Sequence, residues 1–250
     1  MKKHIKIIYA IAAILFWIAV WQILAWRVGK TLLLPSPVQT VNTLLDLASK
    51  SDFWYICFSS VANIFVGALL GVVIGIAIAV LSYANKVIKY LFSPMLTLVK
   101  ATPIASVIIL FLVWIGKAAI PFWISAMMVV PIVASNVLEG LENISHDLKE
   151  VTRVYNFGFA KSWRLLYRHS LLPYFSSSLK SGIALSWKAG IAAEVLCTPD
   201  GTIGNMIYES KVYLETAELF AWTLTVIVLS LILEKTVVFA SSRLMGGDRK

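Results

Sequence analysis

Six apolar runs, each close to the length of a bilayer crossing, constrain the fold of this chain more than any other feature. They lie at about residues 5–25, 61–81, 91–115, 119–138, 171–197 and 217–240. A helix needs about 20 consecutive apolar residues to cross the hydrocarbon core of a membrane. The pattern therefore predicts an all-α membrane protein with about six transmembrane helices.

The composition excludes a soluble globular domain. Hydrophobic residues make up 59% of the chain and charged residues only 14%, whereas a soluble domain averages about 25% charged residues. Cys57, Cys197 and three separated histidines supply neither a disulfide framework nor the clustered ligands of a metal site. We expect no cofactor.

The runs divide the chain into three segments. Residues 1–58 hold the first span and an external surface helix, residues 59–240 form a five-helix core with a cytoplasmic loop at about 139–173, and residues 241–250 form a tail. Lys2, Lys3 and Lys6 precede the first run as in a signal peptide. The run is longer than an h-region of about 7 to 15 residues and lacks a convincing cleavage site. We therefore expect a retained helix.

The basic residues predict the orientation of the six-span arrangement. Thirteen of the 22 Lys and Arg residues fall on the side of both termini and of the loop at 139–169, and five fall on the other side. Cytoplasmic loops carry the excess of Lys and Arg. Both termini and this loop are thus expected in the cytoplasm of a bacterial cell, with the chain in the inner membrane. Contact with membrane explains the net charge of +9 without nucleic acid.

One long polar interruption, residues 139–169, must contact something soluble. It predicts two short amphipathic helices joined by a bend at Asn156, Phe157 and Gly158. Gly158 is the residue expected to take a positive φ there, because glycine alone adopts it without steric cost. A helix-bend-helix segment on one side of a membrane protein suggests a coupling device.

Local patterns predict three further details. Ser36, Pro37 and Gln39 form a capping sequence that starts the external helix. Gly67, Gly71 and Gly75 share one face of the second span, which favours close helix packing either within one chain or between two copies. Prolines in the third and fourth spans favour kinked helices that line the interior of the bundle. These are Pro94, Pro103, Pro121 and Pro131.

Charged residues inside spans are costly and usually face a cavity or a partner. The candidates are Lys100, Lys180, Lys188 and Glu194. In one interpretation Lys188, together with Lys100, attracts an anion along a wet pathway. In the other, Glu194 pairs with a lysine on a neighbouring helix and Lys180 extends to the cytoplasmic interface.

Helical periodicity places the polar residues of the fifth span on two faces. Lys180, Trp187 and Glu194 share one face. The second face, about a quarter-turn away, holds Ser177, Ser181, Ala184 and Lys188. This second face has room for water, so Ser181 and Lys188 join Lys100 and Glu194 as candidates for a translocation path.

Several short motifs are spread over the chain: Leu34-Pro35-Ser36-Pro37, Ala101-Thr102-Pro103-Ile104-Ala105, Trp114-Ile115-Gly116, Ser186-Trp187-Lys188 with Ala193-Glu194, and Gly201-Thr202-Ile203-Gly204. Together they resemble the motifs of one family, the permease subunits of type I ABC importers, in the branch that takes up nitrate, sulfonate and taurine. The resemblance implies a permease fold with a cytoplasmic coupling helix. It implies a homodimer of permeases with separate ATP-binding cassette ATPase subunits and an extracytoplasmic substrate-binding protein. The chain itself would catalyse no reaction.

In that family the cytoplasmic loop contains a Glu-Ala-Ala motif, a glycine and a later Leu-Pro. Glu150, Gly158 and Leu172-Pro173 are the corresponding positions here, with Val151 and Thr152 in place of the alanines and wider spacing. The resemblance thus implies that Glu150, Gly158, Phe159 and Pro173 take part in coupling to the ATPase. It also implies a substrate such as a sulfonate, nitrate, a taurine-like anion or a vitamin precursor.

Two other classes of membrane protein remain as alternatives. A secondary transporter usually contains an inverted repeat, and the two halves of this chain show no convincing similarity. A membrane-embedded enzyme needs convergent catalytic groups, and only Glu194 and the lysines within spans qualify.

Overall fold

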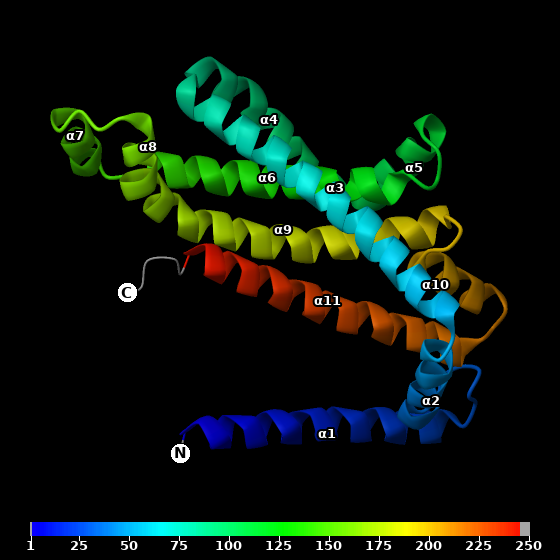
Figure 1. Ribbon diagram of the computed structural model, residues 1–250. Helices are drawn as coiled ribbons and strands as arrows, with labels where there is room; N and C mark the ends of the chain where they lie inside the picture. The colour runs from blue at the N-terminus through cyan, green and yellow to red at the C-terminus, as the bar shows by residue number, and fades with distance from the viewer. Residues whose placement is uncertain (1, 246–250) are drawn as a thin grey trace.

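The computed structural model describes residues 2–245, without the side chains at positions 2–7, 10, 153, 159, 242, 244 and 245. Every regular element in that range is a helix (Figure 1). The elements are α1 (Lys2–Val28), α2 (Pro37–Ala48), α3 (Ser51–Ala84), α4 (Lys86–Ala101), α5 (Ile104–Trp114), α6 (Ile120–Glu142), α7 (His146–Val154), α8 (Phe159–Ser162), the π-helix η1 (Trp163–Tyr167), α9 (Arg168–Cys197), α10 (Ile203–Val212) and α11 (Thr216–Met245). The prediction of an all-α protein is confirmed for the described residues.

The helices define two ends of the molecule. In Figure 1 the start of α1, the end of α11 and the pair α7 and α8 lie at the left, while α2, α5 and α10 lie at the right. Helices α1, α6, α9 and α11 run between the two ends, and α3 crosses them obliquely. We call α7, α8 and the bend between them the elbow, and we refer to the elbow end and the opposite end.

Helix α6 is the centre of the core and packs against α3 and α9. Its Ile120, Ile124 and Val133 are completely buried. Gly190 lets α9 approach the other two helices, because a Cβ there would lie 2.7 Å from Ile64 of α3 and 2.8 Å from the hydroxyl of Ser125 of α6. The three helices therefore form one close-packed unit.

Three glycines bring α3 against α6. A Cβ at Gly71 would lie 2.5 Å from the carbonyl oxygen of Ala126, and a Cβ at Gly67 would overlap the carbonyl group of Phe122. A Cβ at Gly75 would lie 2.8 Å from the Cβ of Val133. Of the two alternatives for this glycine face, the contact within one chain is the one that the structure contains.

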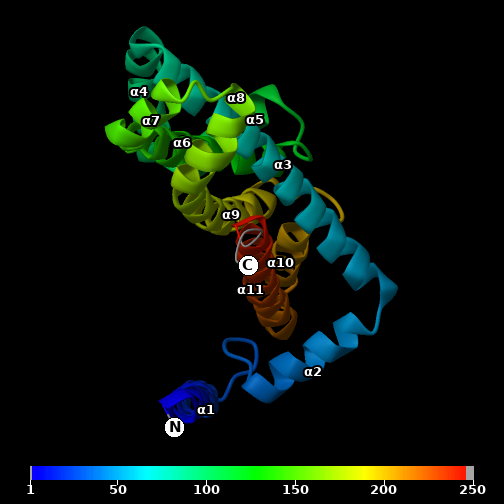
Figure 2. The same ribbon diagram turned by 60° about the vertical axis from the view of Figure 1, so that its left-hand side comes forward.

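Helix α1 stands apart from the other long helices, as both views show (Figures 1 and 2). It is joined to the rest near its end: the Trp21 indole N–H donates to the carbonyl oxygen of Pro35 at 3.1 Å. The Trp21 ring also stacks on Phe220 of α11, with ring centroids 5.8 Å apart. The side chains at positions 11–19 of α1 are exposed in the single chain.

Four helices are long and apolar enough to cross a membrane, or five if the bent pair α4 and α5 forms one span. The four segments are Ile11–Val28, Ser51–Ala84, Ile120–Glu142 and Thr216–Ser241. The predicted fifth span forms the 30-residue helix α9, which is long enough but is not among these segments. Lys180, Lys188 and Glu194 lower its apolar character, so composition alone does not identify it as a span.

The predicted third span, residues 91–115, consists of two helices with a sharp break between them. Helix α4 ends at Ala101, α5 starts at Ile104, and their axes differ by 103°. Thr102 is extended, with φ −76° and ψ 131°, because the ring of the following proline disfavours the helical conformation at the preceding residue. Pro103 also has no N–H to continue the helix.

The expectation that the four prolines line the bundle interior is confirmed for the two in α6 and wrong for the two in the α4–α5 region. Pro121 and Pro131 of α6 are buried, whereas α4 contains no buried residue and Pro94 is exposed. Pro103 is likewise exposed at the break. The α4–α5 unit therefore lies at the margin of the single chain.

The external helix begins as predicted. The Ser36 hydroxyl accepts from the Gln39 N–H at 3.2 Å, and the Gln39 side-chain oxygen accepts from the Ser36 N–H at 3.1 Å. Pro37 occupies the first helical position. This reciprocal capping box fixes the start of α2.

Replacing Gly71 by leucine should force α3 and α6 apart, because even a Cβ would lie against the Ala126 carbonyl. We expect the free energy of unfolding to fall by about 1–3 kcal/mol or more, measured as a lower Tm of the purified chain in detergent. Val73→Leu on the same helix is the control, since Val73 is 64% exposed. Equal Tm values for the two variants would contradict the close contact.

Candidate functional site

The elbow projects from the bundle at one end of α6 and α9 (Figures 1 and 2). Within α7, Glu150 lies 3.4 Å from His146 one turn earlier, and both side chains are exposed. The Lys149 ammonium lies 5.4 Å from the centre of the Tyr83 ring, which connects α7 to the end of α3. The elbow is thus attached to the core mainly by its base.

The bend of the elbow is formed by Asn156. Its φ is 48°, whereas Gly158 is not among the residues with positive φ, so the expectation that Gly158 takes this conformation is wrong. Asparagine tolerates the left-handed region because its short polar side chain can hydrogen-bond locally. The Phe157 N–H donates to the Thr152 carbonyl oxygen at 2.9 Å and closes the turn.

Gly158 is exposed and lies in open space. A Cβ at this position would have no heavy atom within 4 Å. Glu150 and Gly158 both lie on the elbow, while Pro173 lies inside α9, beyond η1, and is exposed. Phe159 starts α8, and its side chain lies outside the described part of the chain.

The elbow exposes apolar side chains. Val154 is 79% exposed and Tyr155 is 70% exposed, and Leu148 and Val151 are also exposed. Large apolar side chains that gather on a projecting segment are typical of an interaction surface.

A π-helical turn, η1, connects the elbow to α9. The rings of Trp163 and Tyr167 stack across this turn, with centroids 6.3 Å apart. Short π-helical turns within α-helices frequently occur at functional sites. No sequence pattern predicts η1, because its residues fit an ordinary amphipathic helix equally well.

The second polar face of α9 is exposed as predicted. Ser177, Ser181 and Lys188 are all exposed, and Ala184 between them is partly buried. Lys100 of α4 donates to the Ser135 hydroxyl of α6 at 2.8 Å.

Lys100 also lies beside the α9 face. It lines one hollow of about 370 Å³ together with Pro103 and Leu185 of α9. Leu185 is three residues from Lys188 in the sequence, so the structure brings Lys100 near the face that carries Ser181 and Lys188.

Glu194, in contrast, is completely buried. Its Oε2 accepts from the Ser60 hydroxyl at 2.9 Å and from the Gly204 N–H at 3.0 Å. Ser60 also accepts from the Ile203 N–H at 2.9 Å. Glu194 therefore ties the start of α10 to α3 and α9, and within the described chain its Oε1 has no hydrogen-bond partner.

The predicted pairing of Glu194 with a lysine is wrong for residues 2–245, where only Ser60 and Gly204 reach its carboxylate. Lys180 instead lies 3.4 Å from Glu234 of α11. The Trp187 indole N–H donates to the Val226 carbonyl oxygen of α11 at 3.2 Å. The face with Lys180, Trp187 and Glu194 is thus a packing face.

A family model described as the binding-protein-dependent transport system inner membrane component matches residues 71–245. The chain belongs to this family. It is the membrane permease component of a binding-protein-dependent ABC transporter, and it is not itself catalytic. The resemblance inferred from the motifs is therefore confirmed.

Three relatives resemble this permease over most of its length. The nitrate import permease protein NrtB of Synechocystis sp. is 26% identical over 98% of this chain and 92% of its own. The formylaminopyrimidine transport permease protein ThiX of Halalkalibacterium halodurans is 26% identical over 80% of each chain. The taurine transport system permease protein TauC of Escherichia coli is 21% identical over 86% of this chain and 80% of its own.

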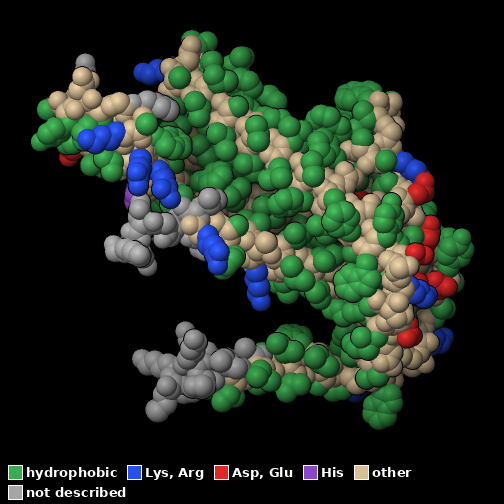
Figure 3. Space-filling view, viewed as in Figure 1, with side chains coloured by type: hydrophobic (Ala, Val, Ile, Leu, Met, Phe, Trp, Pro, Cys, Tyr) green, Lys and Arg blue, Asp and Glu red, His purple; other side chains and the backbone are tan. Residues whose placement is uncertain are grey.

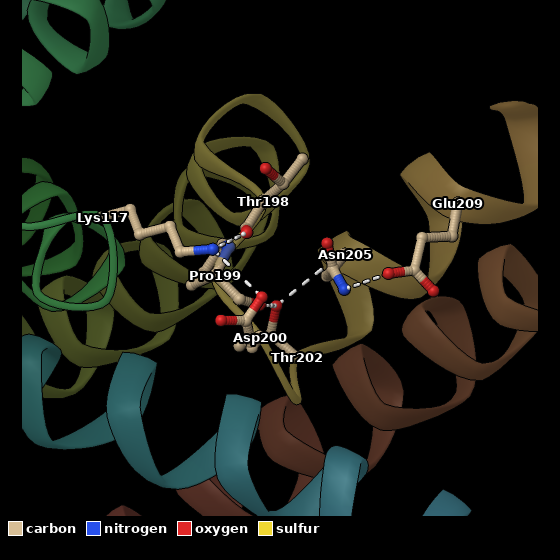
Figure 4. A network of polar contacts seen from close by, with 7 residues as sticks. All are labelled: Lys117, Thr198, Pro199, Asp200, Thr202, Asn205 and Glu209. Carbon is tan, nitrogen blue, oxygen red and sulfur yellow. Dashed lines mark hydrogen bonds and ion pairs between the residues drawn. The ribbon is translucent and has the colours of Figure 1, made fainter.

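At the opposite end of the permease, polar contacts join the α5–α6 loop to the α9–α10 loop (Figure 4). Lys117 donates to the carbonyl oxygen of Thr198 at 3.1 Å and lies 3.0 Å from a carboxylate oxygen of Asp200. The Thr202 hydroxyl accepts from the Asn205 N–H at 3.3 Å and caps α10. Both loops are therefore held together next to the Glu194 contacts.

The motif Gly201-Thr202-Ile203-Gly204 now has a physical explanation. Gly201 has a φ of 69°, which glycine adopts without strain. Thr202 caps α10, and a Cβ at Gly204 would overlap Glu194. Ser60 is the member of this site that sequence reasoning missed, because it is far away in the chain and a serine in a span is unremarkable by composition.

Replacing Glu194 by alanine should destabilise the permease, because the hydroxyl of Ser60 and the N–H of Gly204 lose their acceptor. A buried donor left without a partner costs about 1–3 kcal/mol. We expect a lower Tm in detergent for Glu194→Ala and a smaller decrease for Glu194→Gln, which keeps one acceptor oxygen.

Glu215→Ala is the control, because this carboxylate lies at the same end of the molecule and is exposed. A Tm of Glu194→Ala equal to that of Glu215→Ala would show that the buried contacts contribute nothing.

Proposed function

We propose that this permease couples transport to ATP hydrolysis by docking its elbow on the ATPase subunit of its transport system. The observation that carries the proposal is the projecting elbow with its exposed apolar side chains, at the end where α1 starts and α11 ends. Movement of the docked ATPase would pass through η1 into α9 and through the base of α7 into α6.

The charge distribution supports an elbow end that faces the cytoplasm. Figure 3 shows Lys and Arg side chains gathered near the elbow, whereas Asp and Glu side chains gather near the opposite end. Cytoplasmic segments of membrane proteins carry the excess of basic residues. Both termini then lie in the cytoplasm, and α2 and α10 face the extracytoplasmic binding protein.

Helix α9 is expected to cross the membrane as the fifth of six spans, with α4 and α5 together as the third. A single lipid-exposed helix would not tolerate Lys180, Lys188 and Glu194. Glu194 is buried and Lys180 is paired, so Lys188 is the charge of α9 that still needs a polar environment. A water-filled path between two copies of the permease provides it.

We propose that Lys188, Ser181 and Lys100 line this path and favour an anionic substrate. One relative is named for nitrate, which is an anion, and another for taurine. ThiX is named for formylaminopyrimidine, so a vitamin precursor is the second candidate class. Lys100 and Lys188 favour the anion, since an uncharged ligand gains nothing from two cations.

Gly158→Val should weaken association with the ATPase without unfolding the permease. Apart from the adjacent residues, no described heavy atom lies within 4 Å of a Cβ at Gly158, so a docked partner would be the group that senses the added side chain. The measurement is co-purification of the ATPase with the permease from membranes.

Gly116→Val is the matched control, because Gly116 also lies in open space but between α5 and α6, at the opposite end. Equal recovery of the ATPase with both variants would argue against docking at the elbow.

Lys188→Met should lower substrate uptake by about tenfold or more, because a lysine in a low-dielectric channel attracts anions over a distance. Assembly and basal ATP hydrolysis should stay unchanged, since Lys188 is exposed and takes no part in the Glu194 contacts. Uptake is measured in proteoliposomes. Lys235→Met on α11, also exposed, is the control, and an equal loss of uptake in both variants would contradict the path.

A further inference from the structure

An apolar hollow of about 230 Å³ lies where the elbow joins the bundle. Its walls come from four elements: Ile76 and Val80 of α3, Leu141 of α6, Trp163 of η1, and Arg168 and Phe175 of α9. Arg168 is the only charged residue among the lining residues. Val80 is 50% exposed and Trp163 is 49% exposed, so the hollow is open at its rim.

The hollow lies on the side of α9 away from the proposed path. Arg168 and Phe175 line the hollow. On the polar face, Ser177 follows Arg168 by nine residues, and Ala184 follows Phe175 by nine residues. Nine residues are about two and a half turns, which places the two sets on opposite faces of the helix. With the polar face of α9 turned toward the proposed path, the hollow opens on the opposite flank, which would then face lipid.

The polarity of the hollow changes along its length. Arg168 is the first residue of α9, and Arg164 one turn earlier on η1 is exposed. Phe175 lies two turns further into the helix, about 10 Å from Arg168 along the axis. A cationic rim at the level of the elbow thus leads into a wholly apolar interior.

We propose that this hollow binds one acyl chain of an anionic phospholipid whose phosphate group is held at Arg168 and Arg164. The interior of the hollow disfavours a small polar anion, because most of its lining side chains are apolar and would leave the anion desolvated. With the elbow end facing the cytoplasm, this rim would lie near the level of the lipid headgroups. Basic pockets between membrane helices bind anionic headgroups in this way.

The bound lipid would contact Trp163, whose ring stacks on Tyr167 within η1. Its occupancy would therefore stabilise the turn that connects the elbow to α9. The lipid-facing side of the hollow follows from the proposed path, so this inference rests on that part of the proposed function, although it needs no ATPase on the elbow. Lipid retention is measured separately from uptake, so the two proposals can fail independently.

The test is retention of lipid by the full-length permease, purified with its partner subunits from nanodiscs of equimolar phosphatidylglycerol and phosphatidylcholine. Retained lipid is measured by mass spectrometry. We expect the unaltered permease to retain phosphatidylglycerol in preference to phosphatidylcholine.

Two variants separate the contributions of chain and headgroup. Val80→Trp fills the hollow from its exposed rim and should lower retention of both lipids several-fold. Arg168→Gln should remove the preference for phosphatidylglycerol. The matched controls are Val228→Trp, at an exposed position of α11, and Lys86→Gln, at an exposed basic position at the start of α4.

A second measurement uses the chain with its hollow intact. Phosphatidylglycerol with brominated acyl chains should quench tryptophan fluorescence more than brominated phosphatidylcholine, and Trp163→Phe should abolish the difference. Equal retention by all variants, or equal quenching by the two lipids, would overturn the proposal. A disulfide or cross-link from Val80→Cys to a second permease copy or to the ATPase would also overturn it, because a protein segment would then fill the hollow.

Discussion

The close approach of α3 to α6 is the contact on which the rest of the structure depends. Because Gly67 and Gly71 carry no side chain, the two backbones meet where any Cβ would collide. Helices in a membrane gain little from apolar association alone and pack best where small residues allow such an approach. Once α3 and α6 are in contact, Gly190 allows α9 to close against both, and the elbow is held by the ends of α6 and α9.

Much of this architecture could be predicted from the sequence, because it follows from local rules. Apolar run length predicts the long helices, and the capping box predicts the start of α2 to the residue. The glycine face of α3 was also evident, although sequence alone could not say whether its partner belongs to the same chain. The segment at 139–169 was correctly interpreted as helices around a bend.

The wrong predictions share one physical cause. In each case the local structure depends on groups that lie far away in the chain or that compete for the same role. An apolar run conceals the break at Thr102, because hydropathy takes no account of the missing N–H of Pro103. Asn156 and Gly158 both suit a bend, and only the surrounding hydrogen bonds assign the positive φ to Asn156. The interpretation that pairs Glu194 with a lysine failed because the residue that reaches its carboxylate, Ser60, lies in another helix and carries no charge. Helical periodicity could select the candidate residues of the proposed path. It could not show which of them are buried and which are exposed, because that depends on how other helices pack.

Among the described side chains of α1, the contacts with the remaining chain lie near its end, at Trp21 and the segment that follows. Only 6% of its membrane-length segment Ile11–Val28 is buried within the chain. The helix is therefore fixed near one end, and the direction of its remaining length depends on what surrounds it. Lipid or a neighbouring subunit must supply the lateral contacts along its free length, so the angle between α1 and the bundle is a property of the assembly and not of the isolated chain.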